Sequence, residues 1–265
     1  MIDFKTGTDK AFKLEVQRGN VPGVTIVHLF GERESMDTNA AGEDIWRVNE
    51  LSATPSAPAS IYITPTPASA GEQMTVISES AGDVNGSTGI DTLELDYLDG
   101  SGDEQTTTVT MNGTTAVDVT PSDVSFVNGM HATAVGTGTV ATGNIRIYKK
   151  ADDTLVYSMI AAGGNQSMVP IYKVPTGKTL YTQGWHAEEA QSKRVAFRIR
   201  STDKHGSLLA GVFCFKDVAY LNGGTSGPLP LDAAIPAASI IKVSGWPDAI
   251  NAEGSCGFWG YLVTN

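Results

Sequence analysis

The most suggestive chemistry in the sequence lies at residues 174–179, VPTGKT, because Gly177-Lys178-Thr179 is how a nucleotide-binding phosphate loop ends. Such a loop has the form GxxxxGK[ST] between a strand and a helix, since a run of backbone N–H groups must surround the phosphates. Tyr172 stands where the first glycine is required, and strand-like residues flank the segment. We therefore expect no nucleotide site, and interpret residues 174–177 as a tight turn with Pro175 at its second position and a positive φ at Gly177.

Carboxylates gather in DYLDGSGDE, residues 96–104, which contains Asp96, Asp99, Asp103 and Glu104. Clustered oxygen ligands are what calcium prefers, but this spacing does not follow the EF-hand pattern. Asp-Gly and Ser-Gly pairs are typical of a tight connection between strands. We interpret the segment as a hairpin loop.

The histidines and cysteines give no recognisable catalytic or metal-binding pattern. The histidines are His28, His131, His186 and His205, and none lies in an HExxH sequence. GGTSGP at 223–228 departs from GxSxG, and Cys214 and Cys256 have no CxxC partner. We predict no catalytic, cofactor-binding or metal-binding residues and no enzymatic activity. Two free thiols are the favoured state of the cysteines, with a bridge between them left open.

Charge and hydropathy restrict the partners. The formal net charge is −11 and the isoelectric point is about 4.7, so nucleic acid and anionic membranes are disfavoured. The longest apolar run, LLAGVFCF at 208–215, is far shorter than the roughly 20 residues of a membrane helix. The first residues lack the apolar core of a signal peptide. We expect a soluble protein that is made in the cytoplasm.

The hydrophobic pattern predicts an all-β fold. In TLELDYL, residues 92–98, Leu93, Leu95 and Tyr97 alternate with acidic residues, as in a half-buried strand. About a dozen such segments at spacings of roughly 8 to 14 residues predict a β-sandwich or jelly-roll-like body.

The organisation along the chain suggests an arm before this body. We predict an extended N-terminal arm over residues 1–52 with one strand, VTIVHLF at 24–30. A Pro/Ser/Ala-rich linker or crossing strand follows at 53–72. The body spans 73–265, either as one sandwich or as two small β subdomains split near residue 205.

Two short motifs connect this β pattern to a family. Gly164-Asn165-Gln166-Ser167 and the sequence YKVPTGK at 172–178 lie in a stretch, residues 136–181, that resembles a segment of virion structural proteins of tailed bacteriophages. LDYLDGSGDEQTTTVTMNG at 95–113 is also similar to these proteins. The family pattern has a glycine shortly after the asparagine, which Asn144-Ile145-Arg146-Ile147 lacks, so this chain departs from it there. The resemblance covers about half the chain, residues 73–201.

The resemblance implies a non-enzymatic particle component. Some similar proteins are capsid cement or decoration proteins, often trimers, and others belong to the tail or to head fibres. We expect a head-stabilising protein on the capsid surface of the virion, made in the host cytoplasm, with the major capsid protein and itself as partners. The arm would lie across neighbouring capsid subunits by strand addition.

Two further classes of function stay open. A tail, baseplate or fibre component could bind host surface glycan by stacking on the aromatic residues late in the chain, among them Trp185, Trp246 and Trp259. The favoured interpretation of these residues is sheet core or a subunit interface. A phage-borne glycan hydrolase would need two carboxylates about 5 to 9 Å apart, and Glu188 and Glu189 are among many candidates.

Overall fold

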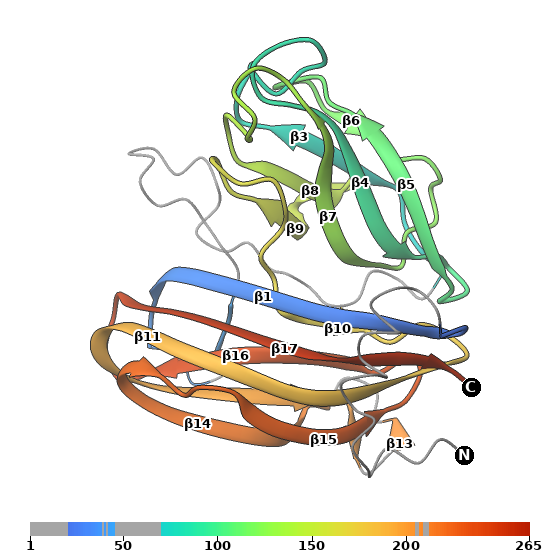
Figure 1. Ribbon diagram of the computed structural model, residues 1–265. Helices are drawn as coiled ribbons and strands as arrows, with labels where there is room; N and C mark the ends of the chain where they lie inside the picture. The colour runs from blue at the N-terminus through green and yellow to red at the C-terminus, as the bar shows by residue number, and fades with distance from the viewer. Residues whose placement is uncertain (1–20, 39, 41, 46–69, 205–206, 209–211) are drawn as a thin grey trace.

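The computed structural model describes residues 21–38, 40, 42–45, 70–204, 207–208 and 212–265, and the protein is all-β over these ranges. Its strands form two sandwich-like bodies that lie one above the other in Figure 1. The part of the chain that the structure describes contains no helix long and apolar enough to cross a membrane. The predicted fold class is therefore confirmed.

In chain order the strands are β1 (Val24–Met36), β2 (Glu43–Asp44), β3 (Met74–Ser78), β4 (Ile90–Leu98), β5 (Glu104–Thr110), β6 (Val117–Asp118), β7 (Phe126–Val135), β8 (Ile145–Lys149), β9 (Asp152–Ile160), β10 (Ile171–Lys173), β11 (Lys178–Ser201), β12 (Asp203–Lys204), β13 (Ser207–Leu208), β14 (Cys214–Thr225), β15 (Leu229–Ile235), β16 (Ile240–Pro247) and β17 (Ala252–Thr264).

The large sandwich is one eight-stranded sheet, β1-β17-β11-β16-β10 with β14, β15 and β2 attached, that curls over itself. The 24-residue strand β11 makes this possible. Its first half pairs with β17 and β15, and its second half pairs with β16 and β14. Trp185 of the first half, Phe197 of the second half and Phe258 of β17 are fully buried in the same core. The two halves therefore form the facing layers of the sandwich.

A buried carboxylate forms the corner between the two halves of β11. The pairing with β14 shifts register between Glu189 and Arg194, which marks a β-bulge. Glu189 is buried and accepts the backbone N–H groups of Gln191 and Lys193 at 2.9 and 3.0 Å. These bonds satisfy a charge that would be costly to bury alone, and they fix the bend.

The small sandwich consists of strands β3 to β9 in two sheets, β6-β3-β8-β9 and β5-β4-β7. Alternate residues of β4, among them Leu93 and Leu95, point into its core, where they meet Val76 of β3 and Ile147 of β8. The alternation in TLELDYL is thus an accurate signal. DYLDGSGDE is the β4–β5 hairpin loop, in which Asp99 accepts the N–H groups of Ser101 and Asp103.

The boundaries of the two bodies differ from those that the sequence suggested. Residues 24–30, placed in an arm, lie in β1, which runs to Met36 and pairs with β17 as a strand of the large sandwich. Val27, Met36 and Ile45 are part of its core. The chain passes from the small to the large sandwich between β9 and β10, not near residue 205. Residues 1–20 and 46–69, which include most of the expected arm and linker, lie outside the described residues.

Asp83 organises one end of the small sandwich. Its fully buried carboxylate accepts hydrogen bonds from the Ser78 hydroxyl at 2.6 Å and from the N–H groups of Ile90, Thr142 and Gly143 at 2.9 to 3.0 Å. These donors come from loops and strands far apart in the sequence. The side chain therefore ties the β3–β4 connection to the start of β8.

Asp83→Ala is expected to lower the free energy of unfolding of the small sandwich by about 3 kcal/mol or more, because four donors, three of them in buried hydrogen bonds, lose their acceptor. The described tryptophans lie in the large sandwich, so their fluorescence would not report unfolding of the small sandwich. Hydrogen exchange of the backbone amides of β3 and β8 is therefore the suitable measurement. Asp153→Ala at an exposed position is the matched control and should change exchange little. Equal exchange rates in the two variants would show that the carboxylate is dispensable.

Candidate functional site

The motif that carries the family resemblance lies where the two sandwiches meet. Asn128 of β7 donates from Nδ2 to the Lys173 carbonyl at 3.1 Å, and its Oδ1 accepts the Lys173 N–H at 3.0 Å. The amide side chain thus replaces a neighbouring strand for β10. Upstream, the Ser167 hydroxyl accepts the Met130 N–H, and the Asn165 carbonyl accepts the Ala132 N–H. The segment GGNQS, residues 163–167, is therefore hydrogen-bonded to β7 as well.

VPTGKT is the turn between β10 and β11, as expected. Gly177 has φ of +69°, as expected. The Lys178 N–H donates to the Pro175 carbonyl, so Pro175 is the first residue of the turn. The turn therefore begins one residue later than predicted. The turn packs on the β4–β5 hairpin, where the Thr176 hydroxyl donates to the Ser101 carbonyl at 3.0 Å. The ammonium group that a phosphate loop would use, that of Lys178, is paired with Glu104 of the small sandwich.

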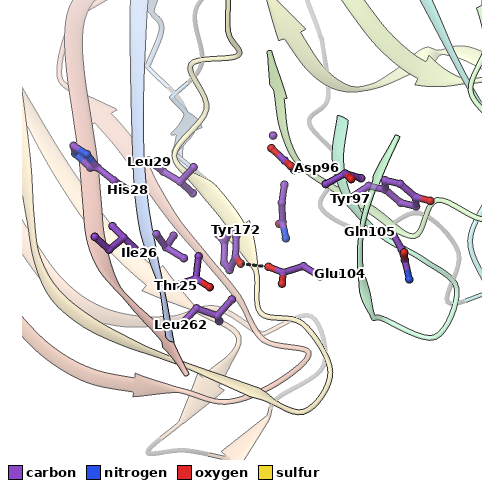
Figure 2. Close-up of a pocket in the computed structure, with 14 residues that line it drawn as sticks. Thr25, Ile26, His28, Leu29, Asp96, Tyr97, Glu104, Gln105, Tyr172 and Leu262 are labelled. Atoms are coloured by element: carbon purple, nitrogen blue, oxygen red, sulfur yellow. Dashed lines mark hydrogen bonds between the residues drawn. The ribbon is translucent and has the colours of Figure 1, made fainter. Parts of the chain in front are cut away.

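Glu104 joins both sandwiches. It accepts a hydrogen bond from the Tyr172 hydroxyl at 3.3 Å (Figure 2). It also forms an ion pair with Lys178. Burial, together with the Glu104 carboxylate, raises the pKa of Tyr172 well above its ordinary value, so the hydroxyl stays protonated and donates.

An apolar cluster completes the junction. Buried side chains from β4, β7, β9, β10 and β16 contact one another there: Leu98, Phe126, Val156, Met159, Ile171 and Ile240. Apolar contacts from both sandwiches in one cluster, together with the polar bonds above, hold the two bodies in a fixed arrangement.

A cleft of about 540 Å³ lies beside this junction, between β1 and the small sandwich. Figure 2 shows Thr25 and Leu29 of β1 on one side of the cleft, and Asp96 and Glu104 of the small sandwich on the other. Burial raises the pKa of Asp96, and the charge of His131 lowers it in part. Among the polar residues that line the cleft, Glu104, Tyr172 and Asn128 are hydrogen-bonded within the junction.

A second feature is a row of rings on the outer face of the large sandwich, over β1, β17 and β11. Phe30 and His186 stack with centroids 5.8 Å apart, and His186 stacks with Trp259 at 6.2 Å. His28 meets the edge of Trp259 at 6.3 Å. We call these four residues the aromatic row.

Glycines make the aromatic row possible. Gly257 of β17 lies directly between Phe30 and His186, so the two rings approach across a position without a side chain. A Cβ at Gly257 would lie 2.8 Å from Cε1 of His186, and one at Gly184 would lie 2.5 Å from Cζ2 of Trp259. The rings therefore lie against the backbone and present broad surfaces.

A hollow of about 230 Å³ adjoins Phe30 and is lined by Glu32, Glu188 and Glu253 together with Ser255. The Ser255 hydroxyl donates to Glu188 at 3.4 Å, and Gln191 donates to Glu253 at 2.9 Å. Burial and the nearby His28 lower the pKa of His186, an effect that Glu188 opposes. A flat ring beside carboxylate acceptors is an arrangement that can stack on a sugar and bind its hydroxyl groups.

The residues weighed from the sequence are dispersed. His131 lies 3.5 Å from Glu94 in the small sandwich, and His205 falls outside the described residues. Glu188 is exposed whereas Glu189 is buried at the corner of β11, so the two carboxylates do not face one groove. Within the described ranges, no group of three or more histidine, cysteine or acidic side chains is placed to hold a metal ion.

Both cysteines are free thiols, Cys256 buried and Cys214 half-buried, which was the favoured prediction. Burial raises the pKa of the Cys256 thiol well above its ordinary value.

Comparison with known proteins gives no family. No protein-family model matches the chain, and no curated protein is significantly similar to it. Among solved structures, the chain is similar to one in a structure of infectious bursal disease virus, Gx strain, at 12% identity, with 91% of this chain and 73% of that chain covered. The TM-score is 0.26, which does not establish a shared fold.

Asn128→Ala is expected to speed hydrogen exchange of the Lys173 amide by about tenfold, because that N–H loses its acceptor at the junction. NMR exchange rates measure this directly. Asn85→Ala, at an exposed turn of the small sandwich, is the matched control and should leave the Lys173 rate unchanged. An unaltered Lys173 rate in Asn128→Ala would mean that the other contacts alone maintain the junction.

Proposed function

We propose that this chain is a non-enzymatic structural protein of a tailed-bacteriophage virion, and that it acts as a capsid decoration protein. In this proposal it binds the lattice of the major capsid protein on the outside of the shell and assembles with copies of itself, with a trimer as the expected form.

The observation that carries the proposal is the position of the motif that resembles virion proteins, which lies at the junction of the two sandwiches. Residues 164–178 hold β7, β10 and the β4–β5 hairpin together, through Asn165, Ser167, Lys173 and Thr176. The residues that resemble virion proteins therefore fix how the two sandwiches are placed relative to each other. A motif that fixes a rigid block supports a mechanical role for the protein.

The stabilising action would follow from mass action. A protein that binds assembled shell subunits but not separated ones stabilises the shell by RT ln(1 + [L]/Kd), about 2.7 kcal/mol per site at a hundredfold excess over Kd. A rigid body loses little conformational entropy on binding, so more of the contact energy appears as affinity. The fixed junction between the sandwiches provides that rigidity.

Quantitative mass spectrometry and imaging of purified virions test the proposal. We expect a copy number comparable with that of the major capsid protein, density on the shell, and lower heat resistance in particles that lack the chain. Restoration of that resistance by added purified protein is the control. Density confined to the tail would refute the decoration role, and absence of the chain from virions would refute a structural role altogether.

The aromatic row favours a second candidate, a tail, baseplate or fibre component that binds host surface glycan. Trp259 and His186 offer stacked rings, and the adjoining hollow offers acceptors from Glu32 and Glu253. Stacking on sugar rings beside hydrogen-bond acceptors is the chemistry that this function requires.

Binding of the purified protein to host surface polysaccharide, measured by calorimetry, tests this second function. Trp259→Ala is expected to weaken binding by at least about tenfold, because the stacking surface is lost. Trp246→Ala is a matched control, since Trp246 lies on β16, on the other layer of the sandwich. Lack of binding by the unchanged protein, or equal binding by both variants, would exclude the aromatic row as a glycan site.

A further inference from the structure

The outer face of the second layer of the large sandwich combines cations with aromatic rings. Directly paired residues of antiparallel strands share a face. Pairing thus aligns Tyr220 with Ala196 and Trp246 in one row, and Phe215 with Arg200 and Lys242 in another. We call this the basic aromatic face, and define it by Arg194, Arg198, Arg200, Phe215, Tyr220 and Trp246.

Arg198 lies at the centre of this face. Its guanidinium carbon is 4.3 Å from the centroid of Trp246 and 5.3 Å from that of Phe215. Such contacts occupy the flat sides of a guanidinium and leave its N–H groups at the edge for an acceptor. Among the described residues, no carboxylate forms an ion pair with Arg198.

The neighbouring cations differ from Arg198 in this respect. Asp44 of β2 accepts a hydrogen bond from Lys242 at 2.9 Å and lies 3.8 Å from Arg200. The charge of Arg200 and Lys242 is thus partly compensated within the protein. Arg194, which is exposed, and Arg198 supply the excess positive charge of the face.

Large apolar side chains surround these charges in solvent. Tyr220 is 75% exposed, Phe215 is 61% exposed, and Val218 between them is 39% exposed. Tyrosine, tryptophan and arginine are the residues most enriched at energetically important positions of protein interfaces. The composition of the face is therefore that of a binding surface. Part of the face lies on β14, an edge strand that pairs only with β11 among the described strands.

Charge indicates the chemistry of the partner. The whole chain carries −11, so a positive face on it is complementary to an acidic surface. Nucleic acid would be repelled by the remainder of the molecule. A symmetric dimer through this face would bring the same arginines against each other, which is unfavourable.

The position of the face suits attachment to a surface. Figure 1 shows β14, the edge strand that contains Phe215 and Tyr220, on the side of the large sandwich that lies away from the small sandwich. A partner bound there would leave the small sandwich directed outward. We propose that the basic aromatic face binds an acidic segment of the shell protein, an inference that rests on the proposed capsid role. Carboxylates of that segment pair with Arg194 and Arg198, and its apolar side chains cover Phe215 and Tyr220.

The test measures binding of the purified full-length chain to shells that lack it. We expect the affinity of the unchanged protein to fall steeply as salt rises, since charge pairs contribute to it. Arg198→Glu and Tyr220→Ala should each raise Kd by about tenfold or more. Tyr220 is so exposed that its truncation does not threaten folding, and thermal melts check Arg198→Glu.

Matched controls separate this face from the rest of the surface. Lys150→Glu makes the same change of charge on the small sandwich, and Tyr181→Ala removes a tyrosine that is 42% exposed on the other layer of the large sandwich. Both should leave Kd within about twofold. Binding by all variants alike would overturn the assignment of the face and leave the capsid role standing.

Two other results also contradict the proposal. Failure of the unchanged protein to bind shells refutes the capsid role and, with it, the named partner. Concentration-dependent self-association that Arg198→Glu abolishes, seen by light scattering without shells, would assign the face to a second copy of the chain.

Discussion

The large sandwich depends on one strand that belongs to both of its layers. β11 has two neighbours in each half, so its bend determines how β17 and β15 face β16 and β14. The bend is fixed by Glu189, whose buried carboxylate is satisfied by N–H groups of the bulge itself. A charge in the interior is tolerated because it has these donors, and the same bonds give the corner a single geometry. The outer surfaces of the two layers take their relative orientation from this corner.

The two layers consequently present different chemistry to solvent. The first layer carries rings and carboxylates around His186 and Trp259, and the second carries rings and cations around Arg198 and Trp246. Both of these tryptophans, Trp246 and Trp259, lie late in the chain. Their separation to opposite faces of one body gives it two outer surfaces of different chemistry.

The sequence predicts local structure well and spatial assembly poorly. Alternation in TLELDYL and the turn after β10 are decided within a few residues, and both are found where predicted, although the turn begins one residue later than expected. The pairing of β1 with β17 joins Val24 to Val263, and no local pattern encodes it. For the same reason Trp185, Trp246 and Trp259 could not be divided between core and surface, since that depends on register. Gly257 can be seen in the sequence, but only the strand register shows that it lies between Phe30 and His186.

The small sandwich lies between β2 and β10 of the large one, so the large sandwich is discontinuous in the chain. This order has a consequence for biosynthesis. All strands of the small sandwich leave the ribosome together, and its contacts can form as soon as β9 has been made. β1, although made first, has no partner strand among the described residues until β17 is complete. The enclosed module can therefore fold early, while the module around it closes only when the two distant segments meet.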